Sequence, residues 1–216
     1  MHTTRSEMPN EWPINRKGTK YLITTNHAKR NSIPILFIIR DVLKVAQKRK
    51  EVKAILMQKQ VRVNLRVIKN EGFPIQVDDT ISFEKSNKNY RLELENGKLK
   101  LQEINEKEAT KKTVKVIGKT LLEDKKVQLN FRDGQNILTN EKVAVGDSII
   151  LALKEMKLEK ILPLKEGANI EIIGGKYAGD KGKLKLIQER ERGKRYLIKI
   201  KDGEIDLPFK LIKVIE

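Results

Sequence analysis

The sequence predicts an α+β protein in which a small helical module comes first, a β-rich central domain follows, and a small β-barrel ends the chain. Apolar residues repeat at helical spacing only between about residues 32 and 58. From residue 61 onward, short runs alternate apolar with polar residues between Asn/Gly turn signals. We therefore expect a basic N-terminal extension (1–31), the helical module (32–85), the central domain (86–162) and the barrel (163–216).

Composition indicates a protein that binds a polyanion. The 216 residues are 38% hydrophobic and only 5% aromatic, which favours several small cores, and the formal net charge is +17. Residues 29–69 alone hold 12 basic and 2 acidic side chains. Concentrating the charge in one folded stretch is typical of a nucleic-acid-binding face, although a Lys-rich surface without a ligand is the alternative.

Several classes of protein are disfavoured. The absence of cysteine excludes disulfides and thiolate metal sites. The longest apolar run, Ile33 to Ile39, is far shorter than the ~18 residues that a membrane span needs, and the polar N-terminus lacks a signal-peptide core. We therefore expect a soluble, cytoplasmic protein with no membrane partner.

The first 31 residues are polar and contain Pro9, Pro13 and Gly18, which predicts a poorly ordered extension. Its cations are candidates for RNA contacts that order on binding, and a frayed terminus is the alternative. These candidates are Arg16, Lys17, Lys20, Lys29 and Arg30.

Two amphipathic helices are expected next. Ser32 is a plausible N-cap and Pro34 suits a first turn, after which apolar residues repeat from Ile35 to Val45. The second helix spans about Lys48 to Gln58. Both helices place like charges one turn apart, which is unfavourable unless a polyanion relieves the repulsion, and a solvated face is the alternative. The candidate RNA-binding cations are Arg40, Lys44, Lys48, Arg49, Lys53 and Lys59.

The run from Val61 to Ile68 predicts a β-hairpin that turns at Asn64, with Arg62 and Arg66 near its tip as further RNA-binding candidates. A loop at Pro74 and a returning strand with Ile81 and Phe83 follow.

This opening resembles a known RNA-binding fold. Two short helices, a basic loop, a Val-x-Val hairpin and the closing strand VDDTISF (77–83) are similar to the small domain named after bacterial ribosomal protein S4. The stretches 12–14 (WPI), 32–36 (SIPIL) and 40–43 (RDVL) resemble the archaeal and eukaryotic small-subunit ribosomal protein S4e family. That family usually has Asp-Gly at the hairpin turn, where this chain has Asn64-Leu65.

The central domain is expected to be a β-rich scaffold with nearly balanced charge. Asn96-Gly97 lies between two alternating runs, which is a strong hairpin signal. Further strands are expected at 114–122, 127–131 and 148–153. Its resemblance to the family depends on its position between two better-marked modules.

The last module begins with EGANIEIIGGKYAGDKGKL (166–184), in which alternating isoleucines precede Gly175, Gly179 and Gly182. This resembles a KOW motif of small SH3-like barrels, with further strands at 196–200 and 205–207. A barrel that contacts another protein is the alternative. A phosphate-binding P-loop is excluded by the missing Gly-Lys-Ser/Thr pattern. The RNA-binding candidates here are Lys176, Tyr177, Lys181 and Lys183.

No catalytic or metal-binding constellation is recognisable. The two histidines, His2 and His27, lie in the N-terminal extension, and no paired carboxylates are placed across a pocket. RNA-modifying enzymes carry a similar RNA-binding module, but the residues after 69 leave little room for a catalytic domain. The sequence therefore predicts a protein without enzymatic activity, cofactor or metal.

The order of the three modules resembles the S4e family over nearly the whole chain. The resemblance implies a structural constituent of the small ribosomal subunit that binds small-subunit rRNA, lies beside neighbouring small-subunit proteins and is a monomer within the ribosome. The alternatives are a KOW-containing transcription-associated protein and a regulatory RNA-binding protein.

Overall fold

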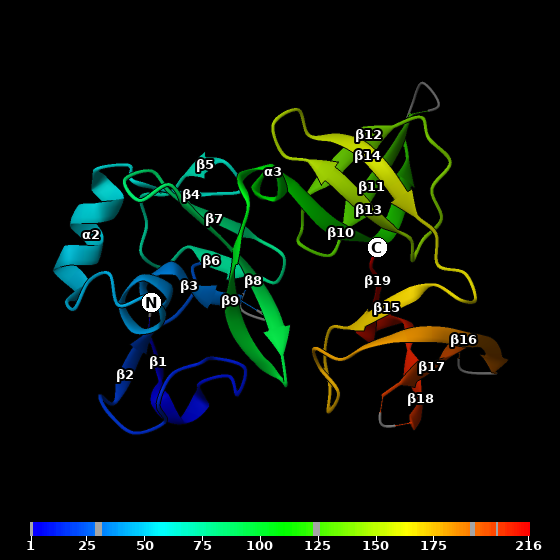
Figure 1. Cartoon of the computed structure of the whole chain (residues 1–216), viewed down its shortest axis with the longest axis horizontal. Helices are drawn as coiled ribbons and strands as arrows, with labels where there is room; N and C mark the ends of the chain where they lie inside the picture. Colours follow the sequence, from blue (N-terminus) through cyan, green and yellow to red (C-terminus); the bar gives the residue numbers. More distant parts are fainter. Residues whose placement is uncertain (1, 29–31, 123–125, 191–192, 202) are drawn as a thin grey trace. The chain divides into compact units, whose positions relative to one another are not determined.

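The computed structural model describes residues 2–28, 32–122, 126–190, 193–201 and 203–216 (Figure 1). The chain divides into two compact units, Met1–Thr110 and Lys111–Glu216, which are described separately. Strands dominate both units and the helices are short, so the broad α+β class is correct with β-structure prevailing.

The N-terminal residues 2–28 are folded, contrary to the expectation of a poorly ordered extension. Strand β1 (His2–Thr4) pairs with β2 (Tyr21–Ile23). Trp12 is buried, and its Nε1 donates a 2.9 Å hydrogen bond to the Ser32 carbonyl. Local rules miss this order because it comes from burying Trp12 against the neighbouring module, which no short window of sequence reveals. Lys29 and Arg30 lie outside the described residues.

The first predicted helix is shorter than expected. Ser32 lies in strand β3 (Ser32–Pro34), which pairs with β6 (Pro74–Gln76), so it is not an N-cap. The helical turn α1 (Ile35–Phe37) continues into a π-helical segment, Ile38–Val42. The chain then turns at Lys44, whose φ is +54°, and Val45 is 57% exposed rather than part of the core.

The second predicted helix is confirmed as α2 (Arg49–Met57), which buries Val52 and Leu56. Glu51 caps the N-terminus of α2, because its Oε2 accepts hydrogen bonds from the backbone N–H groups of Gln47 (2.8 Å) and Lys48 (3.1 Å). At the other end, the Lys59 N–H donates to the Leu56 carbonyl and Lys59 takes a φ of +58°.

The hairpin prediction is also confirmed. Strands β4 (Val61–Val63) and β5 (Arg66–Val67) are joined by Asn64 and Leu65, with φ of +48° and +65°. Both central residues have positive φ, as a type I′ turn requires. The Asn64 side chain holds the turn, since Nδ2 donates to Asp79 Oδ1 (2.7 Å) and Oδ1 accepts from the Thr80 N–H (3.0 Å).

This hairpin belongs to a five-stranded antiparallel sheet of order β5-β4-β7-β8-β9. Its other strands are β7 (Thr80–Phe83), β8 (Lys88–Glu95) and β9 (Lys98–Ile104), and helix α3 (Glu106–Ala109) follows. The predicted β8–β9 hairpin is the long green arm in Figure 1. Because β7 pairs with β8, the sheet continues across the boundary expected between residues 85 and 86.

The C-terminal unit contains two five-stranded antiparallel sheets. The first has the order β12-β11-β10-β13-β14 and is built from β10 (Lys111–Leu121), β11 (Val127–Phe131), β12 (Asn136–Thr139), β13 (Ser148–Ala152) and β14 (Lys157–Leu162). Strands β10, β11 and β13 match the sequence prediction, whereas β12 and β14 were not expected. Val116, Leu129, Phe131, Ile149 and Leu151 lie in its core.

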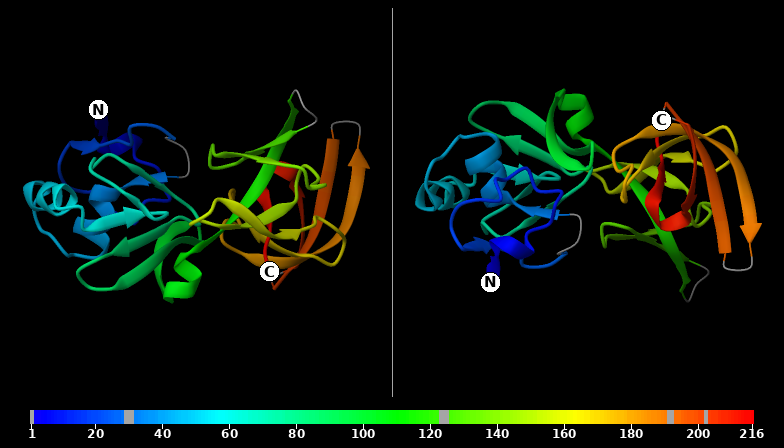
Figure 2. Two further views of the ribbon diagram at one scale, coloured as in Figure 1. Left: turned by 90° about the horizontal axis from the view of Figure 1, so that it is seen from above. Right: turned by 90° about the horizontal axis from the view of Figure 1, so that it is seen from below.

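The second sheet has the order β18-β17-β16-β15-β19 and its own core. Its strands are β15 (Asn169–Ile172), β16 (Lys181–Arg190), β17 (Gly193–Ile200), β18 (Gly203–Pro208) and β19 (Ile212–Val214). The long β16–β17 hairpin is clear in both views of Figure 2. The two sheets are linked within the unit, because Ser148 Oγ of β13 accepts a 3.0 Å hydrogen bond from the Val214 N–H of β19.

Candidate nucleic-acid interface

Helix α2 carries the densest cluster of predicted RNA-binding residues, but two of its cations share an anion within the protein. Arg49 Nε lies 2.9 Å from both carboxylate oxygens of Glu71, and Lys53 Nζ lies 3.7 Å from Glu71 Oε1. Glu71 is only 8% exposed on its side chain, whereas both cations are more than half exposed. Hydrogen bonds from Arg49 hold the pKa of Glu71 below its usual value.

This arrangement corrects one sequence argument. The like charges of Arg49 and Lys53 favour an external polyanion or a solvated face in the sequence, whereas in the structure Glu71 relieves their repulsion internally. The three groups still carry a net charge of +1 toward solvent. Sequence reasoning missed Glu71 because it is 18 residues from Lys53 and reaches α2 only through the chain reversal between β5 and β6.

Two other predicted cations also have intramolecular partners. Arg40 pairs with Asp41 at 2.9 Å and lies 5.4 Å from the Phe37 ring. Arg62 pairs with Glu84, and both side chains are nearly half exposed. An exposed pair such as Arg62–Glu84 contributes little to stability, about 0–1 kcal/mol, so phosphate can compete for Arg62.

The remaining predicted RNA-binding cations of the helical module are exposed and form no ion pair with any described residue. They surround the ends of the helices and the β4–β5 hairpin, and they are Lys44, Lys48, Lys59 and Arg66. Glu51 offsets part of the charge of Lys48, whereas the other three have no ion-pair partner in the described part of the chain and present full charges to a polyanion.

The N-terminal candidates are exposed but differ in their contacts. Arg16 donates to the side chain of Asn10, and Lys20 Nζ lies 5.3 Å from the Tyr21 ring. Lys17 has no ion pair among the described residues and is fully available. Arg5 stabilises the fold of residues 2–28, because its Nε donates a 2.7 Å hydrogen bond to the Thr19 carbonyl.

In the C-terminal unit, the candidates gather where β15 turns into β16. Lys176, Lys181 and Lys183 are exposed, and Lys176 Nζ lies 5.4 Å from the Tyr177 ring. Tyr177 is partly buried against the core of its sheet, which leaves less of its ring for a base.

The register of this sheet adds a residue that sequence reasoning missed. Lys183 of β16 is paired directly with Lys199 of β17. Like charges directly opposite each other are destabilising, and both lysines are exposed without an ion pair in the described chain. The alternation in 196–200 identifies the strand, but only the pairing places Lys199 beside Lys183.

No group of three or more His, Asp or Glu residues in the described chain is arranged to hold a metal ion. Among the described residues, no helix has the length and apolar character of a membrane span.

Comparison with known proteins decides the family. The model of the ribosomal family S4e matches residues 86–158. The small ribosomal subunit protein eS4 of Methanosphaera stadtmanae is 36% identical over 197 residues, covering 89% of this chain and 82% of the relative. The chain belongs to the ribosomal S4e family.

Other S4e proteins support this assignment over most of the chain. The eS4 protein of Archaeoglobus fulgidus is 31% identical over 210 residues, covering 96% of this chain and 88% of the relative. The crystal structure of the 30S ribosomal protein S4e from Thermoplasma acidophilum superposes with a TM-score of 0.74 at 26% identity, covering 87% of this chain and 96% of that chain. The family model matches the central residues, where the local sequence pattern was least distinctive.

Proposed function

We propose that this S4e protein is a structural constituent of the small ribosomal subunit that binds small-subunit rRNA. The observation that carries the proposal is the similarity to proteins named small ribosomal subunit protein eS4 over more than four fifths of both chains. The net charge of +17 and the exposed, unpaired lysines supply the electrostatic attraction that rRNA binding needs.

The mechanism is physical rather than catalytic. Lysine and arginine side chains neutralise phosphates and release counterions, while the folded units fix the local shape of the RNA. The proposed contacts are those of the sequence prediction, to which the pairing in the C-terminal sheet adds Lys199. Among them, the unpaired cations contribute most, because Arg40, Arg49, Lys53 and Arg62 must first exchange an internal carboxylate for a phosphate.

We further propose that residues 32–85 act as the S4-like RNA-binding module, which β8 and β9 extend, and that residues 163–216 act as the KOW-type barrel. The separate core of the C-terminal sheet supports the second assignment. Gly182 of the glycine-rich motif also supports it. A Cβ atom at this position would lie 2.5 Å from the Lys199 carbonyl oxygen, so only glycine fits there. Within the ribosome the protein is a cytoplasmic monomer that contacts neighbouring small-subunit proteins.

Sedimentation of a cell lysate through a sucrose gradient at low and high salt tests the proposal, with the protein followed by mass spectrometry. Stoichiometric co-migration with small subunits that survives high salt is the expected result. Migration at the top of the gradient would overturn the ribosomal assignment. Migration with RNA polymerase would favour the transcription-associated alternative, which explains the glycine-rich barrel but leaves the basic helical module without a role.

A further inference from the structure

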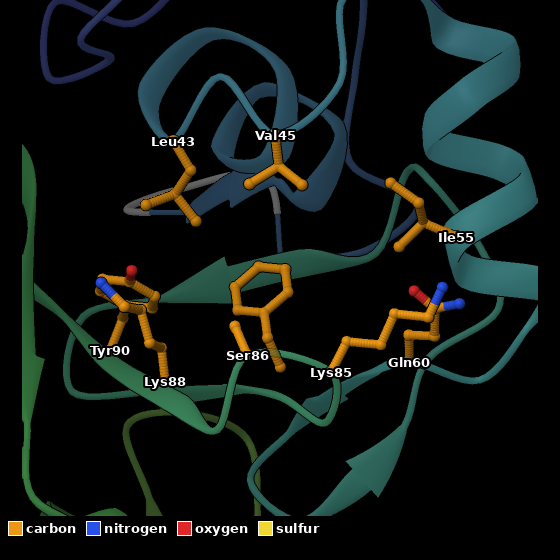
Figure 3. A pocket seen from close by; sticks show the side chains of 9 residues that line it. Leu43, Val45, Ile55, Gln60, Lys85, Ser86, Lys88 and Tyr90 are labelled. Atoms are coloured by element: carbon orange, nitrogen blue, oxygen red, sulfur yellow. The ribbon is translucent and has the colours of Figure 1, made fainter.

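A pocket of about 340 Å³ opens on the N-terminal unit, where the ends of both helical segments meet the β7–β8 hairpin. Figure 3 shows Leu43 and Val45 on one side of it and Lys85, Lys88 and Tyr90 on the other. The volume lies at the lower end of the ~300–1,000 Å³ range of small-molecule sites, so the pocket suits one compact group rather than an extended ligand.

The walls suit a flat, weakly polar group. Leu43, Val45 and Ile55 supply aliphatic surface. Aromatic surface comes mainly from the partly buried Tyr90, whose ring meets that of the buried Phe83 edge to face at 6.0 Å and 82°. The polar groups of the walls include the amide of Gln60 and the hydroxyls of Ser86 and Tyr90. Unstacked RNA bases are bound in this way, between apolar or aromatic surfaces with one or two hydrogen-bonding groups at the base edge.

The surroundings of the pocket are positively charged. Lys85 and Lys88 line it, although Lys88 Nζ lies 3.6 Å from Glu103 Oε1, and the exposed Lys44 and Lys59 are next in sequence to lining residues. The only carboxylate in the turn between β7 and β8, Glu84, is paired with Arg62.

Lys44 and Lys59 also have a costly backbone conformation. Each follows the end of a helical segment with a positive φ, +54° and +58°, a position at which glycine is favoured. At both positions the chain has a cation where glycine would relieve the strain. A positive charge at the C-terminal end of a helix is also favoured by the helix dipole. Two strained lysines next in sequence to lining residues therefore point to a role for positive charge beside the pocket.

We propose that this pocket holds one unstacked base of the bound RNA, with the surrounding lysines on the flanking phosphates. The inference rests on the proposed rRNA-binding function and deepens it by naming the part of the RNA that is recognised. An apolar side chain of a protein neighbour is the competing occupant. It accounts for the aliphatic and aromatic walls but not for the lysines around the mouth.

The test fills the pocket without removing a charge. Val45→Trp places a large side chain at a lining position that is 57% exposed, so the fold tolerates it. The matched control is Val145→Trp, because Val145 is 48% exposed and lies in the other unit. Binding of each full-length protein to a transcript of the organism's own small-subunit rRNA is measured over a range of salt concentrations, and thermal unfolding verifies folding.

The expected result for Val45→Trp is a loss of affinity of about 5- to 140-fold, the range that corresponds to one stacked base. The slope of affinity against salt stays unchanged, because every phosphate contact remains. Chemical probing then shows one base that wild-type protein protects and the variant exposes. Unchanged affinity with Val45→Trp overturns the inference and leaves the proposed function intact.

A second experiment separates RNA from protein as the occupant. A photoreactive p-benzoylphenylalanine replaces Ser86, an exposed lining residue that carries no charge, and the protein is assembled into small subunits. A crosslink to an RNA base supports the inference, and a crosslink to a protein only would overturn it. Failure of the wild-type protein to bind the rRNA transcript would instead count against the proposed function itself.

Discussion

The ammonium nitrogen of Lys115 lies 3.7 Å above the ring of Phe209, deep within the C-terminal unit. Lys115 Nζ also donates hydrogen bonds to the carbonyls of Phe209 and Ile212, the latter at 2.7 Å. These contacts connect β10 of the first sheet to the segment that leads into β19 of the second. Burial, with a smaller contribution from Arg132, lowers the pKa of Lys115 to about 7.

The first prediction is that Lys115 makes the protein more stable as the pH rises from 7 to 10. The unfolded chain keeps the proton up to its ordinary pKa of 10.5, whereas the folded chain releases it near 7. Since the unfolded state then binds more protons, the free energy of unfolding rises with pH in this window, by at most about 1.4 kcal/mol per pH unit. A neutral amine retains two N–H donors, enough for both carbonyls.

Urea unfolding of the wild type and of Lys115→Met at pH 7 and pH 9 measures this effect. The variant should lose the pH-dependent gain, whatever its stability at pH 7. Lys119→Met, at an exposed position on the same strand, is the control and should retain the gain. An equal pH response of wild type and Lys115→Met would contradict the assignment.

The second prediction concerns Glu71, the internal anion of α2. Glu71→Gln should lower the free energy of unfolding at pH 7 by about 1 kcal/mol, because the hydrogen bonds from Arg49 lose their charged acceptor. The pKa of Glu71 is lowered, so its contribution is present above the ordinary value of 4.5 and is lost as the pH falls through the lowered value. The difference between wild type and variant should therefore disappear in acid.

The same variant should bind rRNA with a steeper salt dependence. Freeing Arg49 and Lys53 for phosphate adds about 0.7–0.9 to the slope for each new contact. Glu84→Gln is the matched control. It also frees an arginine, the exposed Arg62, but it should leave the free energy of unfolding almost unchanged. Glu71→Gln with unchanged stability and an unchanged slope would show that the Glu71 contacts have no energetic role.

The third prediction separates stability from binding at Lys59. Lys59→Gly should raise the free energy of unfolding by about 0.5–1 kcal/mol, since glycine takes the positive φ at a helix end without strain. It should also lower the salt slope of rRNA binding by about 0.7–0.9 through loss of one cation. Lys50→Gly, inside α2, also removes a charge but should destabilise the helix by about 1 kcal/mol. If Lys59→Gly binds rRNA like the wild type, Lys59 does not contact phosphate.

The fourth prediction addresses the hairpin turn. Leu65 has a φ of +65°, which costs a residue with a side chain about 1–2 kcal/mol, partly offset by the greater flexibility of glycine in the unfolded chain. Leu65→Gly should therefore stabilise the protein by about 0.5–1 kcal/mol in urea unfolding. Val67→Gly, in strand β5, should destabilise it. A loss of stability with Leu65→Gly would mean that packing of the partly buried leucine outweighs the strain.

Local pattern was sufficient to predict most strands and one helix. The hairpins at 61–67 and 88–104 and the helix 49–57 form where alternation, turn residues and helical spacing predicted them. The ordering of residues 2–28 was predicted wrongly, because Trp12 and Leu22 are buried by contacts distant in sequence. The strands at 136–139 and 157–162 were missed because their alternation is weak, and pairing with neighbouring strands makes them form.

By itself, the sequence determined the charge, its concentration in residues 29–69, the strand-rich composition and the resemblance to the S4e family, since these depend on residue identity and short-range periodicity. Only the tertiary structure decided which cations are free and which are neutralised. An ion pair depends on positions in space, and Glu71 reaches Arg49 across 22 residues. The register of β16 and β17 likewise places Lys183 opposite Lys199, and three segments of the chain, 43–45, 55–60 and 83–90, come together to form the pocket beside Val45.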